Sequence, residues 1–161
     1  MSKDLLQDML VGTSVRQEDC LGYSDEDLAA ISRLYNINVE GQLKGFLSVL
    51  GLSDGGLFKS DAIAIYNAGW GVRQHVLFQT EFCDKMQDAG LHKFLGKPFV
   101  ICYLPSGEYY YLRTKEGDAV YSFDGCGQSV AETGYDLKAF LKISVAPRGS
   151  GVSKKSGLLE I

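Results

Sequence analysis

The chain has 161 residues, of which 45% are hydrophobic, and a formal net charge of -4. A chain of this length can bury one substantial core, and its acidic balance argues against the phosphate backbone of a nucleic acid as the main partner. The opening stretch, MSKDLLQDMLVG, has too short and too charged an apolar run for a signal peptide or a membrane span, so we expect no membrane partner.

Four cysteines stand at positions 20, 83, 102 and 126, without a CxxC pair. This spacing and the absent signal peptide favour a reducing, cytoplasmic compartment with all four thiols free. The spacing also gives no short paired ligands for a metal ion. We therefore expect neither a disulfide nor a metal site.

Apolar spacing predicts helices over residues 2–10, 25–35, 39–50 and 77–90. Ser24 is placed to cap the second of these, and Leu28, Ile31, Leu34 and Tyr35 are its expected buried face. In the third, Leu43, Phe46, Leu47 and Leu50 form the clearest apolar stripe in the chain. Residues 57–58 and 62–66 are predicted as strands, and residues 67–71 as a loop that carries the only tryptophan, Trp70.

Residues 98–124, PFVICYLPSGEYYYLRTKEGDAVYSFD, predict a three-stranded antiparallel meander. Two turns rich in proline, glycine and charge separate three β-prone runs. A short helix over residues 135–143, with Asp136 as its cap, follows. The fold class is therefore α+β, with a mainly antiparallel sheet flanked by N-terminal helices and a short C-terminal helix. We expect one domain over residues 1–145 and a flexible or docked tail over residues 146–161.

Charge is distributed unevenly along the chain. Residues 98–136 hold six acids and two bases, a balance of -4, whereas residues 137–161 hold five bases and one acid, a balance of +4. Solvation of two surfaces explains such asymmetry, and an acidic sheet region also permits a basic partner.

No pattern in the sequence predicts catalysis or a cofactor. His75 and His92 are the only histidines, and neither lies in a recognisable arrangement with a nucleophile. The Gly69-Trp70-Gly71 triplet lacks the third glycine of a dinucleotide-binding fingerprint. Acids such as Glu108 and Asp118 are most simply solvated hairpin residues.

The order of these signals resembles the SUKH superfamily of immunity proteins and cell-wall regulators. The resemblance covers about residues 24–141, where a capped helix, a glycine turn, strands with a Val-Tyr element and a final helix follow one another. Phe46-Leu47, Gly55-Gly56 and Val120-Tyr121 match the family pattern. Val39-Glu40 stands where the family has Leu-Pro, and residues 70–96 are longer than a minimal member needs.

The resemblance implies a binding protein without enzymatic activity that neutralises a cognate bacterial toxin, with nucleases among the targets, in a contact-dependent or type VI system. A regulatory scaffold of the cell-wall-signalling type is the alternative, and a small hydrolase is a third. We expect exposed parts of the meander and the nearby loop to meet a basic toxin surface through Trp70, Glu108, Tyr109, Tyr111, Glu116, Asp118 and Asp124. For each of these, packing or simple solvation is the competing interpretation, and the oligomeric state is left open.

Overall fold

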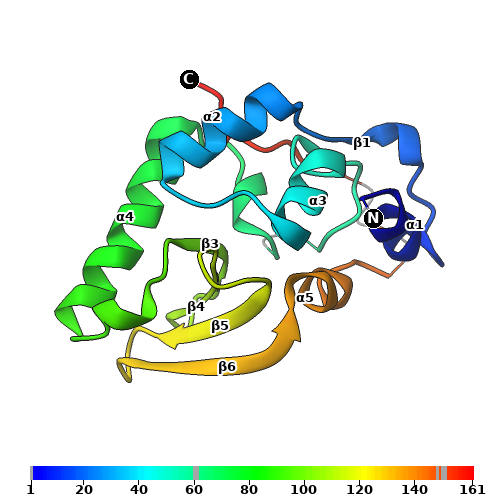
Figure 1. Ribbon diagram of the computed structural model, residues 1–161. Coiled ribbons are helices and arrows are strands. Elements are labelled where there is room, and N and C mark those ends of the chain that lie inside the picture. The colour runs from blue at the N-terminus through cyan, green and yellow to red at the C-terminus, as the bar shows by residue number, and fades with distance from the viewer. Residues whose placement is uncertain (1, 60–61, 148, 150–151) are drawn as a thin grey trace.

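A computed structural model describes residues 2–59, 62–147, 149 and 152–161. Its helices and strands confirm the α+β class (Figure 1). The helices are α1 (Ser2–Leu10), α2 (Asp25–Tyr35), α3 (Gly41–Val49), α4 (Val72–Asp88) and α5 (Leu137–Ile143). The strands are β1 (Cys20–Leu21), β2 (Ser53–Asp54), β3 (Pro98–Tyr103), β4 (Glu108–Arg113), β5 (Ala119–Asp124) and β6 (Ser129–Asp136).

The main sheet is a four-stranded antiparallel meander in the order β3-β4-β5-β6. Its first three strands confirm the predicted meander, and Tyr111 pairs with both Val100 and Tyr121 across it. The fourth strand, β6, was not predicted. Its sequence, SVAETGYD, is largely exposed in the fold and has no apolar alternation to mark a half-buried strand.

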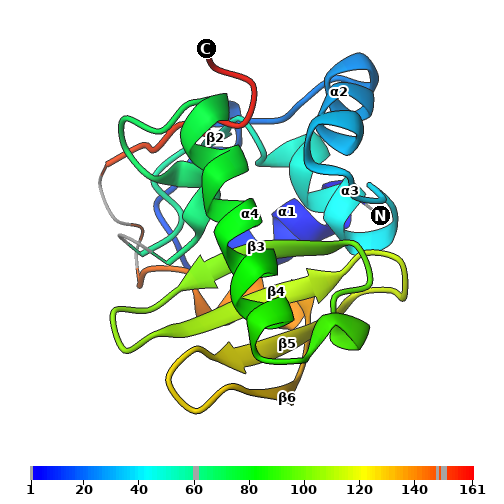
Figure 2. The ribbon, with the colours of Figure 1, turned by 90° about the vertical axis from the view of Figure 1, so that its left-hand side faces the viewer.

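Helices cover both faces of this sheet. Figure 2 shows α4 crossing one face, where Phe82 and Met86 pack on Val100, Tyr111 and Phe123. The alternate sheet residues point to the other face and join the larger core, to which α3 and α5 contribute. Successive strand residues point to opposite faces, so strands buried on both sides read as continuous apolar runs such as FVIC in β3.

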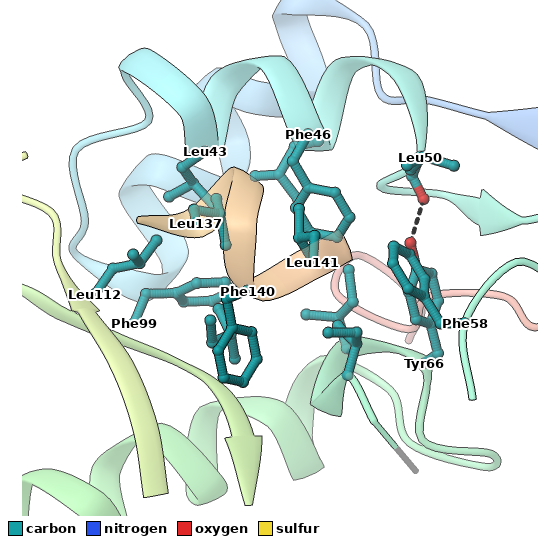
Figure 3. Close-up of a cluster of buried hydrophobic side chains, with 14 of the residues drawn as sticks. Leu43, Phe46, Leu50, Phe58, Tyr66, Phe99, Leu112, Leu137, Phe140 and Leu141 are labelled. Atoms are coloured by element: carbon teal, nitrogen blue, oxygen red, sulfur yellow. Dashed lines mark hydrogen bonds between the residues drawn. The ribbon is translucent and has the colours of Figure 1, made fainter. Parts of the chain in front are cut away.

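Helix α3 lies at the centre of the larger core. Phe46, Leu47 and Leu50 are fully buried, as the sequence predicted. Figure 3 shows Phe46 and Leu43 directed toward Leu137 and Leu141 of α5 and toward Phe58. The rings of Phe46 and Phe58 meet edge to face at 6.2 Å, and the Tyr66 hydroxyl donates a hydrogen bond to the Leu50 carbonyl at the end of α3.

The helix ends follow their capping residues. Ser24 caps α2 by accepting a hydrogen bond from the Asp27 amide, and Asn36 ends it in the left-handed conformation. Asp136 caps α5 through the Ala139 amide. One helix-face prediction is wrong. Leu34 is 46% exposed because α2 packs through Leu28, Ile31 and Tyr35 alone.

Residues 62–66 are not a strand, contrary to the prediction. Residues 64–66 form a 3-10 turn in which Ala64, Ile65 and Tyr66 are all buried. A two-sided burial of this kind produces a continuous apolar run whether the backbone is extended or turned, so the run alone did not distinguish them. Phe58 makes only an isolated bridge, to Val145.

The last residues of the chain form a docked arm, residues 152–161. Ser156 and Leu158 are buried, and the Ser53–Lys155 bridge joins the arm to β2. The Tyr35 hydroxyl donates to the Leu158 carbonyl, and the Tyr23 and Ser156 hydroxyls are 2.9 Å apart. This arm is thus part of the packed unit.

Helix α4 begins earlier than the predicted helix of 77–90. It starts at Val72, where the Val72 amide donates to the carbonyl of Glu160.

All four cysteines are free in the structure. Cys20 and Cys102 are buried, and burial raises the pKa of each thiol to about 11, which keeps both in the unreactive thiol form. Thiol titration of the denatured protein under anaerobic conditions should therefore count four thiols, whereas native protein should react first at the exposed Cys126. A count of two would contradict this prediction.

No helix of the described residues is long and apolar enough to span a membrane.

Candidate functional site

A groove of about 510 Å³ lies beside the middle of α4. Its walls come from the 64–66 turn, the loop that follows it, α4, and the paired strands β3 and β4. The lining residues are Ala64, Asn67, Trp70, Phe78, Glu81, Lys85, Tyr103 and Tyr109. Four of these eight are aromatic, so we call this feature the aromatic groove.

The four rings of the aromatic groove pack on one another. Phe78 is the common neighbour: its ring centroid lies 5.3 Å from Trp70, 6.2 Å from Tyr103 and 6.1 Å from Tyr109. Tyr103 and Tyr109, paired across β3 and β4, are 4.5 Å apart. Ring contacts at these distances hold each side chain in place and leave a rigid apolar surface.

The rings differ in exposure. Phe78 and Tyr109 are 9% and 5% exposed and form the floor, whereas Tyr103 is 43% exposed and Trp70 is half-buried. The aromatic groove therefore has a buried base and two accessible walls. This is the arrangement in which a large apolar group of a partner could be enclosed.

Backbone features place Trp70 and α4. Gly69 has a φ of +79°, which lets the chain turn back before Trp70. The arm approaches so closely that a Cβ on Gly157 would overlap the Trp70 carbonyl oxygen. On α4, the Gln79 side chain accepts from the Val100 amide and donates to the Val100 carbonyl. This clamp fixes α4 to the edge strand β3 and protects it from further pairing.

The predicted contact residues separate into three places. Trp70 and Tyr109 meet in the aromatic groove. Glu108 and Asp124 are paired at one end of the sheet, and Glu116 and Asp118 lie in the β4–β5 turn at the other end. The six-residue strand β4 that separates the two ends is about 17 Å long. The four acids therefore do not form one continuous acidic surface.

Two of the predicted contact residues are not exposed. Tyr111 is fully buried under α4, with its hydroxyl donating to the Phe94 carbonyl, and Tyr109 is accessible only from the aromatic groove. The strand register puts both on the face that α4 covers. The expectation that both are surface residues of the meander is therefore corrected.

The acids near the turns have structural partners. The Asp118 carboxylate accepts from the Gln42 amide and so caps α3 from a distant part of the chain. Glu116 pairs with Arg113, whose guanidinium lies 4.0 Å from the Tyr121 ring centroid. Asp124 accepts from the Cys126 amide and shapes the β5–β6 turn. These contacts agree with the competing interpretation that the acids are structural.

Sequence reasoning missed Asn67, Phe78, Glu81, Lys85 and Tyr103 as groove residues. Phe78 is buried on the inner face of α4, and Glu81 is exposed on the same helix. The missed signal was Tyr103, an aromatic residue at the very end of a strand beside a turn. Tyr103 is 43% exposed here, although its ring contacts Phe78 of α4.

His75 lies behind the groove wall, 1% exposed, with its ring 5.2 Å from Trp70. Its Nε2 atom is buried without a hydrogen-bond partner in the described part of the chain. Burial disfavours the charged imidazolium and lowers the pKa of His75 to about 4.

This histidine predicts a pH dependence of stability. Its folded pKa of about 4 lies below the ordinary value of 6.5, so the unfolded chain binds the extra proton between these limits. The stability that the neutral His75 contributes is fully present above pH 6.5. It is lost as pH falls toward 4, by up to about 1.4 kcal/mol per pH unit. Denaturant unfolding across this range should show a steeper loss of stability in the wild type than in His75→Phe, which keeps only the contribution of carboxylates such as Asp8 and Asp136. Equal slopes would contradict the prediction.

Among the described residues, no group of three or more His, Cys, Asp or Glu side chains could hold a metal ion. The chemistry available in the aromatic groove is that of recognition: aromatic faces, hydroxyls, an amide, one carboxylate and one ammonium. No family model matches the chain. No curated protein and no solved structure matches it either.

Proposed function

We propose that this chain is an immunity protein that binds a toxin transferred between bacteria by a contact-dependent or type VI route, and neutralises it by occlusion without catalysis. It would act in the cytoplasm of the cell that makes it. The observation that carries the proposal is the aromatic groove, in which accessible Trp70 and Tyr103 stand over a rigid floor. The resemblance to the SUKH superfamily supplies the partner class.

The aromatic groove has the composition of an interface anchor. Tryptophan and tyrosine are enriched among the residues that dominate binding at protein interfaces, because they offer a large apolar area and lose little side-chain freedom. Trp70 and Tyr103 are already held by ring contacts with Phe78. A toxin side chain inserted between them would therefore be enclosed without a further ordering cost.

Charge supports a separate part of the proposal, the rate of encounter. The region of residues 98–136 has a balance of -4, and Glu132 on β6 is exposed. Acids of this kind speed association with a basic partner and make it depend on salt. Because Asp118 caps α3, a charge reversal there would also disturb the fold. Glu132→Lys with Glu116→Lys is the cleaner test of the acidic region.

The experiment is protection of growing cells. A candidate toxin domain, chosen as the C-terminal domain of a large secreted protein encoded beside this chain, is expressed with wild type, Tyr103→Ala or Tyr135→Ala. Tyr135 is the matched control because it is also 43% exposed but lies on β6, outside the aromatic groove. Wild type and Tyr135→Ala should protect, and Tyr103→Ala should bind the purified toxin at least about tenfold more weakly. Equal binding by both variants would refute the groove as the contact site.

A further inference from the structure

Four polar side chains that line the aromatic groove have no hydrogen-bond partner among the residues that the structure describes. In the described part of the chain, neither the side-chain amide of Asn67, the indole N–H of Trp70 nor the hydroxyls of Tyr103 and Tyr109 make a hydrogen bond to protein. None of these atoms is among the buried unpaired ones, so none is sealed inside the core. A ligand in the aromatic groove would therefore meet unused hydrogen-bonding groups.

Most of these unused groups donate hydrogen bonds. The indole N–H can only donate, the Asn67 amide carries two donors and one acceptor oxygen, and a phenol both donates and accepts. Burial and the nearby Tyr103 and Glu81 raise the pKa of Tyr109, which keeps its hydroxyl protonated at neutral pH. A complementary ligand offers carbonyl acceptors for these donors and flat apolar groups for the rings.

The charged residues of the aromatic groove limit which class of ligand it can bind. Glu81 and Lys85 lie one turn apart on α4 and are the only ionic groups in the lining, so the lining has no net charge at neutral pH. An aromatic site built for a cation would combine ring faces with acidic groups. Because Lys85 offsets the charge of Glu81, the lining has no net negative charge to hold a cation, which favours a neutral ligand over an arginine or a quaternary ammonium group.

We propose that the aromatic groove binds an extended, proline-rich segment of the protein partner, with proline rings against Trp70 and Tyr103 and main-chain carbonyls accepting from the groove's donors. Proline has no backbone N–H, and a polyproline II segment presents its carbonyls outward and its rings as apolar ridges. Grooves lined by aromatic residues are a recurring means of binding such segments. This inference rests on the proposed function and names the chemistry of the bound segment.

Trp70 gives a direct test because it is the only tryptophan in the chain. Its indole N–H yields one cross-peak in a ¹⁵N–¹H spectrum, and its fluorescence reports the same site. Capped decaproline should shift both signals saturably, while a Gly-Ser peptide of equal length and tetramethylammonium chloride should leave them unchanged. Tyr103→Ala should weaken decaproline binding at least about tenfold relative to Tyr135→Ala. Tyr109→Phe, which keeps the ring, should weaken it by a smaller factor through the lost hydroxyl.

An indole signal that does not change at saturating decaproline overturns the inference. A response to tetramethylammonium that equals or exceeds the response to the peptide also overturns it. Equal affinities of Tyr103→Ala and Tyr135→Ala for decaproline also overturn it, provided both variants melt as wild type does. The toxin experiment separates this failure from that of the proposed function. If the toxin moves the Trp70 signal and decaproline does not, the chain is a toxin binder and the bound segment is not proline-rich.

Discussion

Replacing Phe46 by alanine should lower the free energy of unfolding by about 3–5 kcal/mol. The side chain is fully buried in the middle of α3 and contacts the cluster shown in Figure 3, including the Phe58 ring at 6.2 Å. Because α1, α2, α5 and β1 all pack against α3, the site cannot collapse easily, and the loss combines the transfer free energy with that of a cavity. Denaturant unfolding measures the change.

The control for this variant is Leu34→Ala on the neighbouring helix α2. Leu34 is an apolar helix residue too, but it is 46% exposed, so its removal should cost less than about 1 kcal/mol. A loss below about 1 kcal/mol for Phe46→Ala, or similar losses for the two variants, would mean that α3 is not the centre of the larger core.

Replacing Asp54 by alanine should have an effect of comparable size, about 3–5 kcal/mol. This carboxylate is completely buried and accepts from the amides of Gly56, Phe58 and Lys154 at 2.8, 3.2 and 2.8 Å. It also pairs with the Lys154 ammonium at 3.1 Å. Alanine removes one acceptor from three amides and leaves the partly buried Lys154 charge without its carboxylate.

Asp19→Ala is the matched control, since Asp19 pairs with Arg16 at the same distance of 3.1 Å. The side chains of Arg16 and Asp19 are both well exposed, and an exposed ion pair contributes less than about 1 kcal/mol. Thermal or denaturant unfolding should therefore separate the two aspartates clearly. If Asp54→Ala unfolds like Asp19→Ala, the arm is not held by this ion pair.

The helices and the first three strands of the meander could be predicted because their signals are local. Ser24, Asn36 and Asp136 act on residues a few positions away, and the stripe of α3 depends only on helical spacing. The predictions that failed concern elements that depend on distant partners. The 64–66 turn is buried from two sides, Leu34 lacks an opposing surface, and β6 pairs with β5 through its backbone rather than an apolar face.

The candidate site was predicted only in part for the same reason. Trp70 was recognised from its loop, and Tyr109 from its run of tyrosines, but their meeting across α4 depends on the packing of Phe78. The acids were recognised as a charge pattern, yet one caps a helix that lies 76 positions earlier in the chain. Charge composition gives the sign of a surface, whereas the role of each carboxylate depends on which amides the fold brings to it.

The docked arm has a consequence for how the protein is made. Ser156 contacts Tyr23 across 133 positions, Leu158 contacts Tyr35 across 123, and Lys154 contacts Asp54 across 100. Contacts of such long range cannot form while the arm is still inside the ribosome. The groups that contact the arm, among them Tyr23 and Tyr35, therefore stay uncovered until the arm has emerged. Asp54 likewise lacks its partner ammonium until Lys154, 100 positions later in the chain, has been synthesised.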